Sequence, residues 1–440
     1  MMTVPLELPM RANEAAALAD LILQMGERQV LTTEVRNRLL SRIPSLGLES
    51  LKPYMGSLVK DPTHSSTYYL AVDAVSMAGV AKPFLLHMAL SSAPASAHFM
   101  KPILVGRMRP GGGREIVVNA IPFGPEDIQT VRTFGEQVDR GFLPRPQGML
   151  SSISIAVADP AHDLPKAFEA YQMANQELRM NLAAPVRVEL ADQFEASYAV
   201  GLWGAIRCGW REGYTIEAAL EVSGNDDANL ERVKQSIRMA SIYTKFSLDV
   251  SSLVNDASEG QFETLFDAVE RSWILEEFAR EFPVGGDVGV VRFTQEEIQL
   301  AAVRFAKLLS TTEKLYDEIR REKARSATGR TFDFELKLGS DAVTVTPREM
   351  VFILHWLKSQ RRAAQFIAPH LHEGTYVASV SEFAAVARHF QATLTLTPGD
   401  DLEPEVVEQV ARACGGRVNW RLTKPHDAAY LQALASSLRG

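Results

Sequence analysis

The sequence predicts an α/β protein in which a parallel sheet with helical crossovers follows a smaller α+β domain. Two observations carry this prediction. From residue 153 onward, short runs with strand period alternate with helical segments, an order typical of parallel sheets with right-handed crossovers. Residues 11–121 instead give two helical segments and then apolar runs broken by proline and glycine, which indicates hairpins beside a helix pair.

The N-terminal elements come first in the chain. Residues 143–148 read Leu-Pro-Arg-Pro-Gln-Gly, a composition typical of a linker. We therefore expect an N-terminal α+β domain over 1–143 and a second domain over 148–440. The expected N-terminal elements are helices Ala12–Met25 and Thr32–Arg42, then strands within Tyr68–Val72, Phe84–Leu90, Ile103–Val105 and Ile116–Ile121.

The second domain repeats a strand and helix unit. A clear example is the helix opened by Thr346-Pro347-Arg348-Glu349, where Thr346 is a good N-cap and Pro347 suits the first helical position. The expected helices are Leu164–Leu178, Asp192–Arg211, Asn229–Ala240, Gln261–Phe282, Thr294–Ala324, a helix from about Ser379, Pro404–Cys414 and Asp427–Leu438. The expected parallel, neighbouring strands are Ile153–Ala158, Ile216–Val222, Thr244–Asp249, Phe332–Leu338, Gln365–Ala368, Thr393–Thr397 and Val418–Leu422. A barrel and a doubly wound open sheet both fit this order.

Composition limits the class of partner. The chain has 440 residues, 46% of them hydrophobic, and a formal net charge of -8, so it has no general attraction for nucleic acid or anionic membranes. No apolar run reaches the ~18 residues of a membrane span. Met1–Met25 lacks the organisation of a signal peptide, so we expect a cytoplasmic protein. Cys208 and Cys414 both lie in helical patterns and are expected to be buried thiols.

Searches for catalytic and nucleotide-binding motifs give negative results. The glycine run Gly111–Gly113 lacks the strand-to-helix context of a phosphate loop, so no nucleotide cofactor is expected. The chain also has no Gly-x-Ser-x-Gly elbow, no Cys-x-x-Cys pair and no zincin helix.

Several short motifs occur in an order that resembles one known family. The strongest is Leu-Trp-Gly-Ala-Ile at 202–206, followed by Gly-Trp-Arg-Glu-Gly-Tyr at 209–214 and Tyr-Thr-Lys-Phe-Ser-Leu-Asp at 243–249. Asp333-Phe334-Glu335, Ala368-Pro369 and Gly399 before Asp401 follow in order. Together they resemble the tagaturonate epimerases, metal-dependent sugar-acid epimerases with a barrel fold. The resemblance covers about half of the chain, mostly within 148–440, and implies a TIM-barrel-like second domain.

The resemblance also implies site residues. His162, Asp249, Glu335 and Asp401 remain at matching positions. An epimerase that moves a hydrogen next to a carbonyl needs an electrophile, usually a divalent metal, and acid/base groups. The resemblance thus implies Asp249 and Glu335 as metal ligands, with His162 and Asp401 as catalytic groups. The alternative is that the two carboxylates are inward-facing and hydrogen-bonded, and that His162 caps a helix.

The departures from the family weaken the metal site. Leu220 and Thr397 stand where the family has histidines, and Arg421 stands where its last motif begins with lysine. Zinc, manganese and iron generally need imidazole as well as carboxylate, so we expect a divalent metal to be absent or weakly held, at most an oxygen-preferring ion such as magnesium. His370 and His372 could chelate a metal as an alternative, or lie exposed in a loop. The chain also ends earlier than its relatives, which raises the expectation of an incomplete or atypically closed barrel.

Two functions follow from these patterns. The first is a divergent sugar or sugar-acid (hexuronate) epimerase or isomerase. The second is a pseudoenzyme that keeps the barrel to bind a ligand or a protein partner. Either way, Asp249 and Glu335 are expected to converge at the carboxyl-end mouth of the sheet with Asp401 nearby, because parallel barrels place functional groups there.

Overall fold

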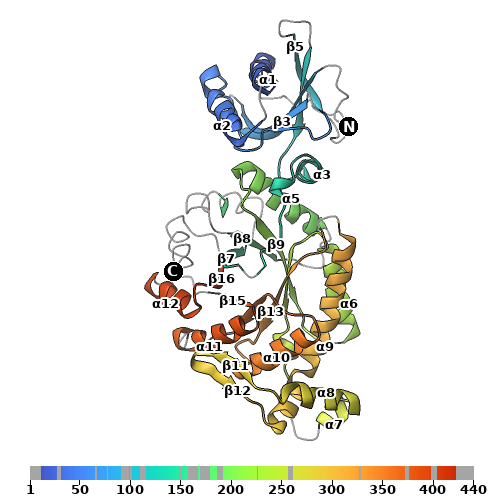
Figure 1. Cartoon of the computed structure of the whole chain (residues 1–440). Coiled ribbons are helices and arrows are strands. Elements are labelled where there is room, and N and C mark those ends of the chain that lie inside the picture. The colour runs from blue at the N-terminus through green and yellow to red at the C-terminus, as the bar shows by residue number, and fades with distance from the viewer. Residues whose placement is uncertain are drawn as a thin grey trace. The chain divides into compact units, whose positions relative to one another are not determined.

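The structure, a computed structural model, divides into two compact units (Figure 1). It describes residues 11–26, 31–64, 67–76, 78–90, 99, 102–109, 115–148, 150–156, 167–168, 179–185, 192–224, 226–255, 261–326, 329–371, 376–397 and 404–422. As far as their residues are described, the first unit comprises Met1–Leu143, Pro160–Glu169 and Glu195–Arg211, and the second comprises Pro144–Asp159, Ala170–Phe194 and Glu212–Gly440. The two-domain division at 143–148 is kept as a proposal.

The first unit packs two helices on one face of an antiparallel sheet. Alternate residues of its strands, such as Leu70 and Leu86, are fully buried in one core with Leu18 of the first helix, as the period of two requires. The sheet order is β1-β3-β4-β6-β5, and β2 pairs with β3. The predicted helices and strands are confirmed as α1 (Ala12–Gly26), α2 (Thr33–Arg42), β3 (Thr67–Val75), β4 (Ala81–Leu90), β5 (Ile103–Met108) and β6 (Ile116–Pro122), joined by β1 (Leu51–Pro53), β2 (Val59–Lys60), α3 (Ile128–Thr133) and the short helices Pro44–Leu46, Phe134–Val138 and Arg140–Phe142.

Helix α5 (Asp192–Cys208) contributes most of its length to this first unit. Arg207 lies 3.6 Å from Asp73 of β3, and Trp203 is buried. The helix was expected to continue to Arg211 but ends at Cys208. Gly209 explains the difference, because its φ of 68° is left-handed and a Cβ there would lie 2.4 Å from the carbonyl oxygen of Met55.

The second unit is a closed barrel of parallel strands (Figure 1). All seven predicted strands are confirmed as parallel. The closure that the sequence left open is achieved by an unpredicted strand, β8, which pairs with β7 on one side and β9 on the other. In order around the barrel its described strands are β10 (Lys245–Asp249), β13 (Asp333–Leu338), β14 (Phe366–Pro369), β15 (Thr393–Leu396), β16 (Val418–Leu422), β7 (Ser152–Ala156), β8 (Arg179–Pro185) and β9 (Tyr214–Glu221).

Helices connect these strands, and each buries one side. Thr346 accepts a hydrogen bond from the backbone of Glu349 and caps the helix Pro347–Ser359 (α10), as predicted. The helix expected over Gln261–Phe282 is wrong: Asp267 forms a capping box with Glu270 that begins a separate helix. The predicted helices Leu164–Leu178 and Asp427–Leu438 lie outside the described residues, apart from 167–168. The observed elements are α6 (Asp227–Met239), Ser251–Leu253, α7 (Phe262–Leu265), α8 (Ala268–Phe278), β11 (Phe282–Gly285), Gly286–Val288, β12 (Gly289–Val291), α9 (Gln295–Arg325), α10 (Pro347–Ser359), α11 (Tyr376–His389) and α12 (Pro404–Ala413).

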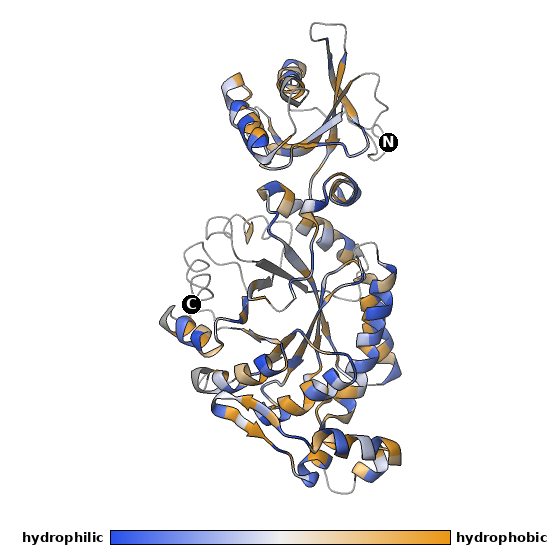
Figure 2. Cartoon of the chain, in the orientation of Figure 1, coloured by the Kyte–Doolittle hydropathy of each residue, from blue (hydrophilic) through white to orange (hydrophobic). Residues whose placement is uncertain are grey.

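Figure 2 shows hydrophobic and hydrophilic residues side by side along these helices. In α9, for example, Phe305, Leu308 and Leu315 are buried whereas Lys307 is exposed, which is the pattern of a helix with one face on a core. Within the described part of the chain, no helix is long and apolar enough to cross a membrane. Cys208 and Cys414 are buried free thiols, as expected.

Candidate functional site

The barrel strands alternate polar and apolar residues, and the polar ones face the lumen. In β10, Lys245, Ser247 and Asp249 alternate with Phe246 and Leu248, which are fully buried. The apolar side faces the helices: the ring of Phe334 in β13 lies 5.1 Å from that of Tyr316 in α9. The polar side chains contact partners on strands that are not their neighbours, which only side chains inside a closed barrel can do.

Four charged residues fill the middle of the lumen. The Nζ of Lys245 lies 3.1 Å from Oε2 of Glu217 and 2.8 Å from Oε2 of Glu335. From the other side, Nη2 of Arg421 donates to Oε1 of Glu217 and to Oε1 of Glu335, each at 2.5 Å. Glu217, Lys245 and Glu335 are fully buried, and Arg421 is 16% exposed. The two negative and two positive charges cancel. We call these four residues the lumen ion-pair network.

Neutral polar side chains extend this network around the barrel. Glu335 accepts a hydrogen bond from Ser247 on Oε1 and another from Thr395 on Oε2, both at 2.8 Å. Thr395 in turn accepts from the side-chain amide of Asn419 at 3.1 Å. Asn419 accepts from the hydroxyls of Ser152 and Ser154 on β7. Each oxygen of Glu335 therefore has one neutral donor and one cationic partner.

The ion pairs shift the pKa values of Glu335 and Arg421 so that both stay charged. Burial alone would raise the pKa of Glu335, but Arg421 and Lys245 outweigh burial and hold that pKa well below its usual value. Burial would lower the pKa of Arg421, but Glu217 and Glu335 raise it above its usual value. A carboxylate with so low a pKa cannot act as a proton donor near neutral pH. Glu335 is therefore a fixed charge and not a general acid.

Above this network, a row of accessible charged residues crosses the mouth of the barrel. Glu221, Asp249 and Lys337 are paired in register on the neighbouring strands β9, β10 and β13. Nζ of Lys337 donates to Oδ2 of Asp249 at 2.6 Å, and Ser251 donates its hydroxyl to Oδ1 at 2.7 Å. The side chain of Asp249 is 29% exposed and that of Lys337 is 45% exposed, while Glu221 is exposed. These three residues, the mouth row, can be reached by a ligand.

The structure gives the predicted metal ligands different partners. Asp249 pairs with Lys337, whereas Glu335, two residues deeper on the neighbouring strand, pairs with Lys245 and Arg421. Both carboxylates are thus ion-paired to the protein's own lysine or arginine side chains. Their convergence with Asp401 stays a prediction.

Of the three histidines predicted as site residues, only His370 lies within the described residues. His370 lies at the barrel mouth, with Nε2 3.0 Å from Oδ1 of the exposed Asp341. His162, His372 and Asp401 lie outside the described residues, so their catalytic and metal-binding roles also stay predictions.

The described residues do not fit the divalent metal that the fold resemblance implies. All the accepting positions on Glu335 are used by the protein's own cations and hydroxyls. Across the described ranges, no group of three or more His, Cys, Asp or Glu side chains is arranged to hold a metal ion. No chemical step is therefore assigned to a metal here.

Leu220 adds a correction to the sequence argument. Leu220 stands where the resemblance places a histidine, but it is buried and pairs in register with the buried Leu248, on the side facing the helices. The residues of β9 on the lumen side are Thr215, Glu217, Ala219 and Glu221. Position 220 therefore says nothing about a ligand in the lumen.

A further buried carboxylate, Asp333, closes the opposite end of the barrel. It accepts hydrogen bonds from the backbone N–H groups of Gln147 at 2.7 Å and Gly148 at 2.9 Å, so it ties the segment before β7 to β13. Burial raises the pKa of Asp333 from 3.8 to about 6, although these two donors act in the opposite direction.

This raised pKa predicts a pH dependence of stability. Because the folded pKa is above the unfolded one, the folded state binds the proton more tightly, and this contribution to stability is lost as pH rises from about 4 to about 6. We expect wild type to lose up to about 3 kcal/mol over this window relative to Asp333→Asn, which cannot titrate. Urea unfolding of both proteins from pH 4 to pH 7 measures the difference, and parallel curves would contradict it.

Comparison with known proteins identifies the fold. No family model and no curated protein matches this chain. Among solved structures, the fructuronate-tagaturonate epimerase from Cohnella laeviribosi in complex with two glycerols has a TM-score of 0.62 and 16% identity, over 88% of this chain and 75% of that chain. Its native structure gives a TM-score of 0.61 and 15% identity, over 87% and 74%. The predicted resemblance is confirmed as a likeness of fold.

Proposed function

We propose that this chain binds a sugar acid at the mouth of its barrel and does not catalyse metal-dependent epimerisation. The observation that carries the proposal is the lumen ion-pair network, which gives Glu335 an arginine and a lysine where a metal-dependent enzyme of this fold would need a free carboxylate ligand. The likeness of fold to a hexuronate epimerase supports the ligand class.

The mouth row supplies the contacts that a sugar acid needs. The ammonium of Lys337 has three donor positions and spends one on Asp249, so it can also bind a carboxylate ligand. Glu221 and Asp249 can accept hydrogen bonds from sugar hydroxyls. An uncharged sugar would lack the charge-assisted contact, so this arrangement favours a hexuronate over a hexose.

A second candidate is an active hexuronate epimerase or isomerase, and the likeness of fold favours it. Glu335 is unsuited to proton transfer, so catalysis would have to use the accessible Asp249 and Lys337 or the predicted His162 and Asp401. A divalent metal would then bind elsewhere than at Glu335.

One experiment separates the two candidates. Purified protein is incubated with tagaturonate or fructuronate, with added manganese, zinc or magnesium and separately after chelation, and conversion is followed by NMR; binding is measured by calorimetry. We expect saturable binding without interconversion. Interconversion that chelation abolishes would overturn the non-catalytic proposal, and absence of binding would overturn the ligand class.

A pair of variants tests the role of the mouth row. Lys337→Met should weaken hexuronate binding at least tenfold, about the loss of one charge-assisted hydrogen bond. Lys307→Met, an exposed lysine of α9, is the matched control and should bind as wild type does. Equal affinities for both variants would remove Lys337 from the site.

A further inference from the structure

The guanidinium of Arg421 occupies the position of a cation that bridges Glu217 and Glu335. One nitrogen atom, Nη2, lies 2.5 Å from a carboxylate oxygen of Glu217 and 2.5 Å from one of Glu335. The two glutamates come from β9 and β13, which are separated by β10 on one side of the barrel. A nitrogen that bridges one oxygen of each carboxylate stands where a cation shared by both carboxylates would stand.

The two carboxylates that contact this nitrogen are oxygen ligands of the kind that a hard cation prefers. The hydroxyls of Ser247 and Thr395 donate to Glu335 and hold its carboxylate in place. Without Arg421, the two glutamates and Lys245 would leave one uncompensated negative charge in a closed space. Such a charge is costly when buried and is lowered in energy by any small cation that can enter.

From this geometry we infer that Arg421 takes the structural place of a divalent cation, so that Glu217 and Glu335 form a cation site which the protein's own guanidinium keeps closed. The wild-type barrel is thus independent of divalent metal for its stability. Loss of the guanidinium opens the site to magnesium, manganese or calcium. The inference does not depend on the sugar-acid proposal, since it concerns stability and cation binding.

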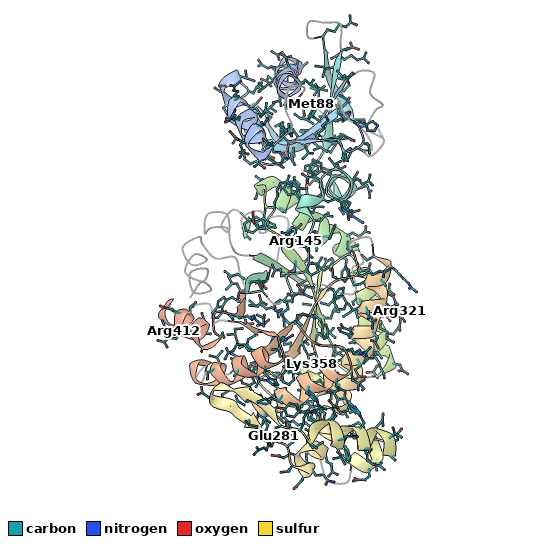
Figure 3. All side chains as sticks on the ribbon, viewed as in Figure 1. Met88, Arg145, Glu281, Arg321, Lys358 and Arg412 are labelled. Atoms are coloured by element: carbon teal, nitrogen blue, oxygen red, sulfur yellow. The ribbon has the colours of Figure 1, made fainter. Side chains whose placement is uncertain are left out.

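The test compares wild type with Arg421→Ala by thermal unfolding and by manganese titration followed by electron paramagnetic resonance. The wild-type melting temperature should not respond to millimolar manganese, calcium or chelator. Arg421→Ala should melt several degrees lower, recover part of that loss with manganese or calcium, and bind one manganese ion per chain. Arg412→Ala is the matched control, because Arg412 on α12 pairs with Glu408 at the surface (Figure 3).

Two further variants make the result decisive. Arg421→Ala combined with Glu335→Gln should lose the response to cations, because one bridging ligand is gone. Arg421→Gln fills more of the space without charge, and it should show the same cation response if Arg421→Ala fails to fold. Stoichiometric manganese binding by wild type would overturn the inference, as would Arg421 variants whose stability and manganese binding are indifferent to cations.

Discussion

Glu335→Gln is expected to destabilise the protein by about 3–5 kcal/mol, because it leaves Arg421 and Lys245 sharing one carboxylate inside the barrel. Glu335 is fully buried, accepts three hydrogen bonds and forms an ion pair with Lys245, so the substitution leaves buried cations without their carboxylate. The free energy of unfolding from urea titration at neutral pH measures this loss.

The matched control for this prediction is Glu408→Gln. Glu408 pairs with Arg412 across one turn of α12, with 65% of its side chain exposed, and solvent already screens such a pair. We expect no measurable change. Equal stabilities for the two variants would mean that the lumen ion-pair network contributes nothing to holding the barrel.

Phe352→Ala is expected to cost about 3–5 kcal/mol through lost burial and the cavity left behind. Phe352 lies in α10, outside the barrel, and is fully buried. Its ring stacks on Phe278 of α8 with centroids 4.1 Å apart and meets the edge of Phe293 at 6.1 Å. Thermal or urea unfolding measures the effect.

Two comparisons identify its cause. Phe352→Leu keeps most of the volume and should lose much less stability, while Val269→Ala, at a side chain 78% exposed, should lose none. Binding of a hexuronate should survive Phe352→Ala in the folded fraction, since this cluster lies on the helices and not at the mouth row. A loss of affinity without a loss of stability would contradict this assignment.

The fold could be predicted largely because local signals were strong. Thr346 and Pro347 predict the start of α10, and the alternation of polar and apolar residues in Phe332–Leu338 predicts β13. Strand β8 was not predicted because Arg179–Pro185 follows directly on the helix expected over Leu164–Leu178 and contains Leu182, Ala183 and Ala184, which suit helices as well as strands. Because β8 was missing from the predicted strands, the sequence could not predict how β7 and β9 are joined in a closed barrel.

The lumen ion-pair network could not be predicted from the sequence for a different reason. Alternation in Lys245–Asp249 is usually a sign of one face in water, but both faces of a barrel strand are buried. Charged residues at alternate positions in such strands have to neutralise one another, and this signal was present at Glu217, Lys245 and Arg421. Their pairing could not be read from the sequence, because it depends on which strands face each other once the barrel closes.

The closure of the barrel has a consequence for how the chain folds. Arg421 and Glu217 are separated by 204 positions, and Asn419 of β16 pairs with Ser152 of β7 across 267 positions. The last described strand therefore closes the barrel against the first strand of the barrel. During synthesis from the N-terminus, the two glutamates are made long before their arginine. Contacts of such high sequence separation are formed late and slow the overall rate. Until β16 is in place, the sheet is open and Glu217 and Glu335 have Lys245 but not Arg421 as a cation partner.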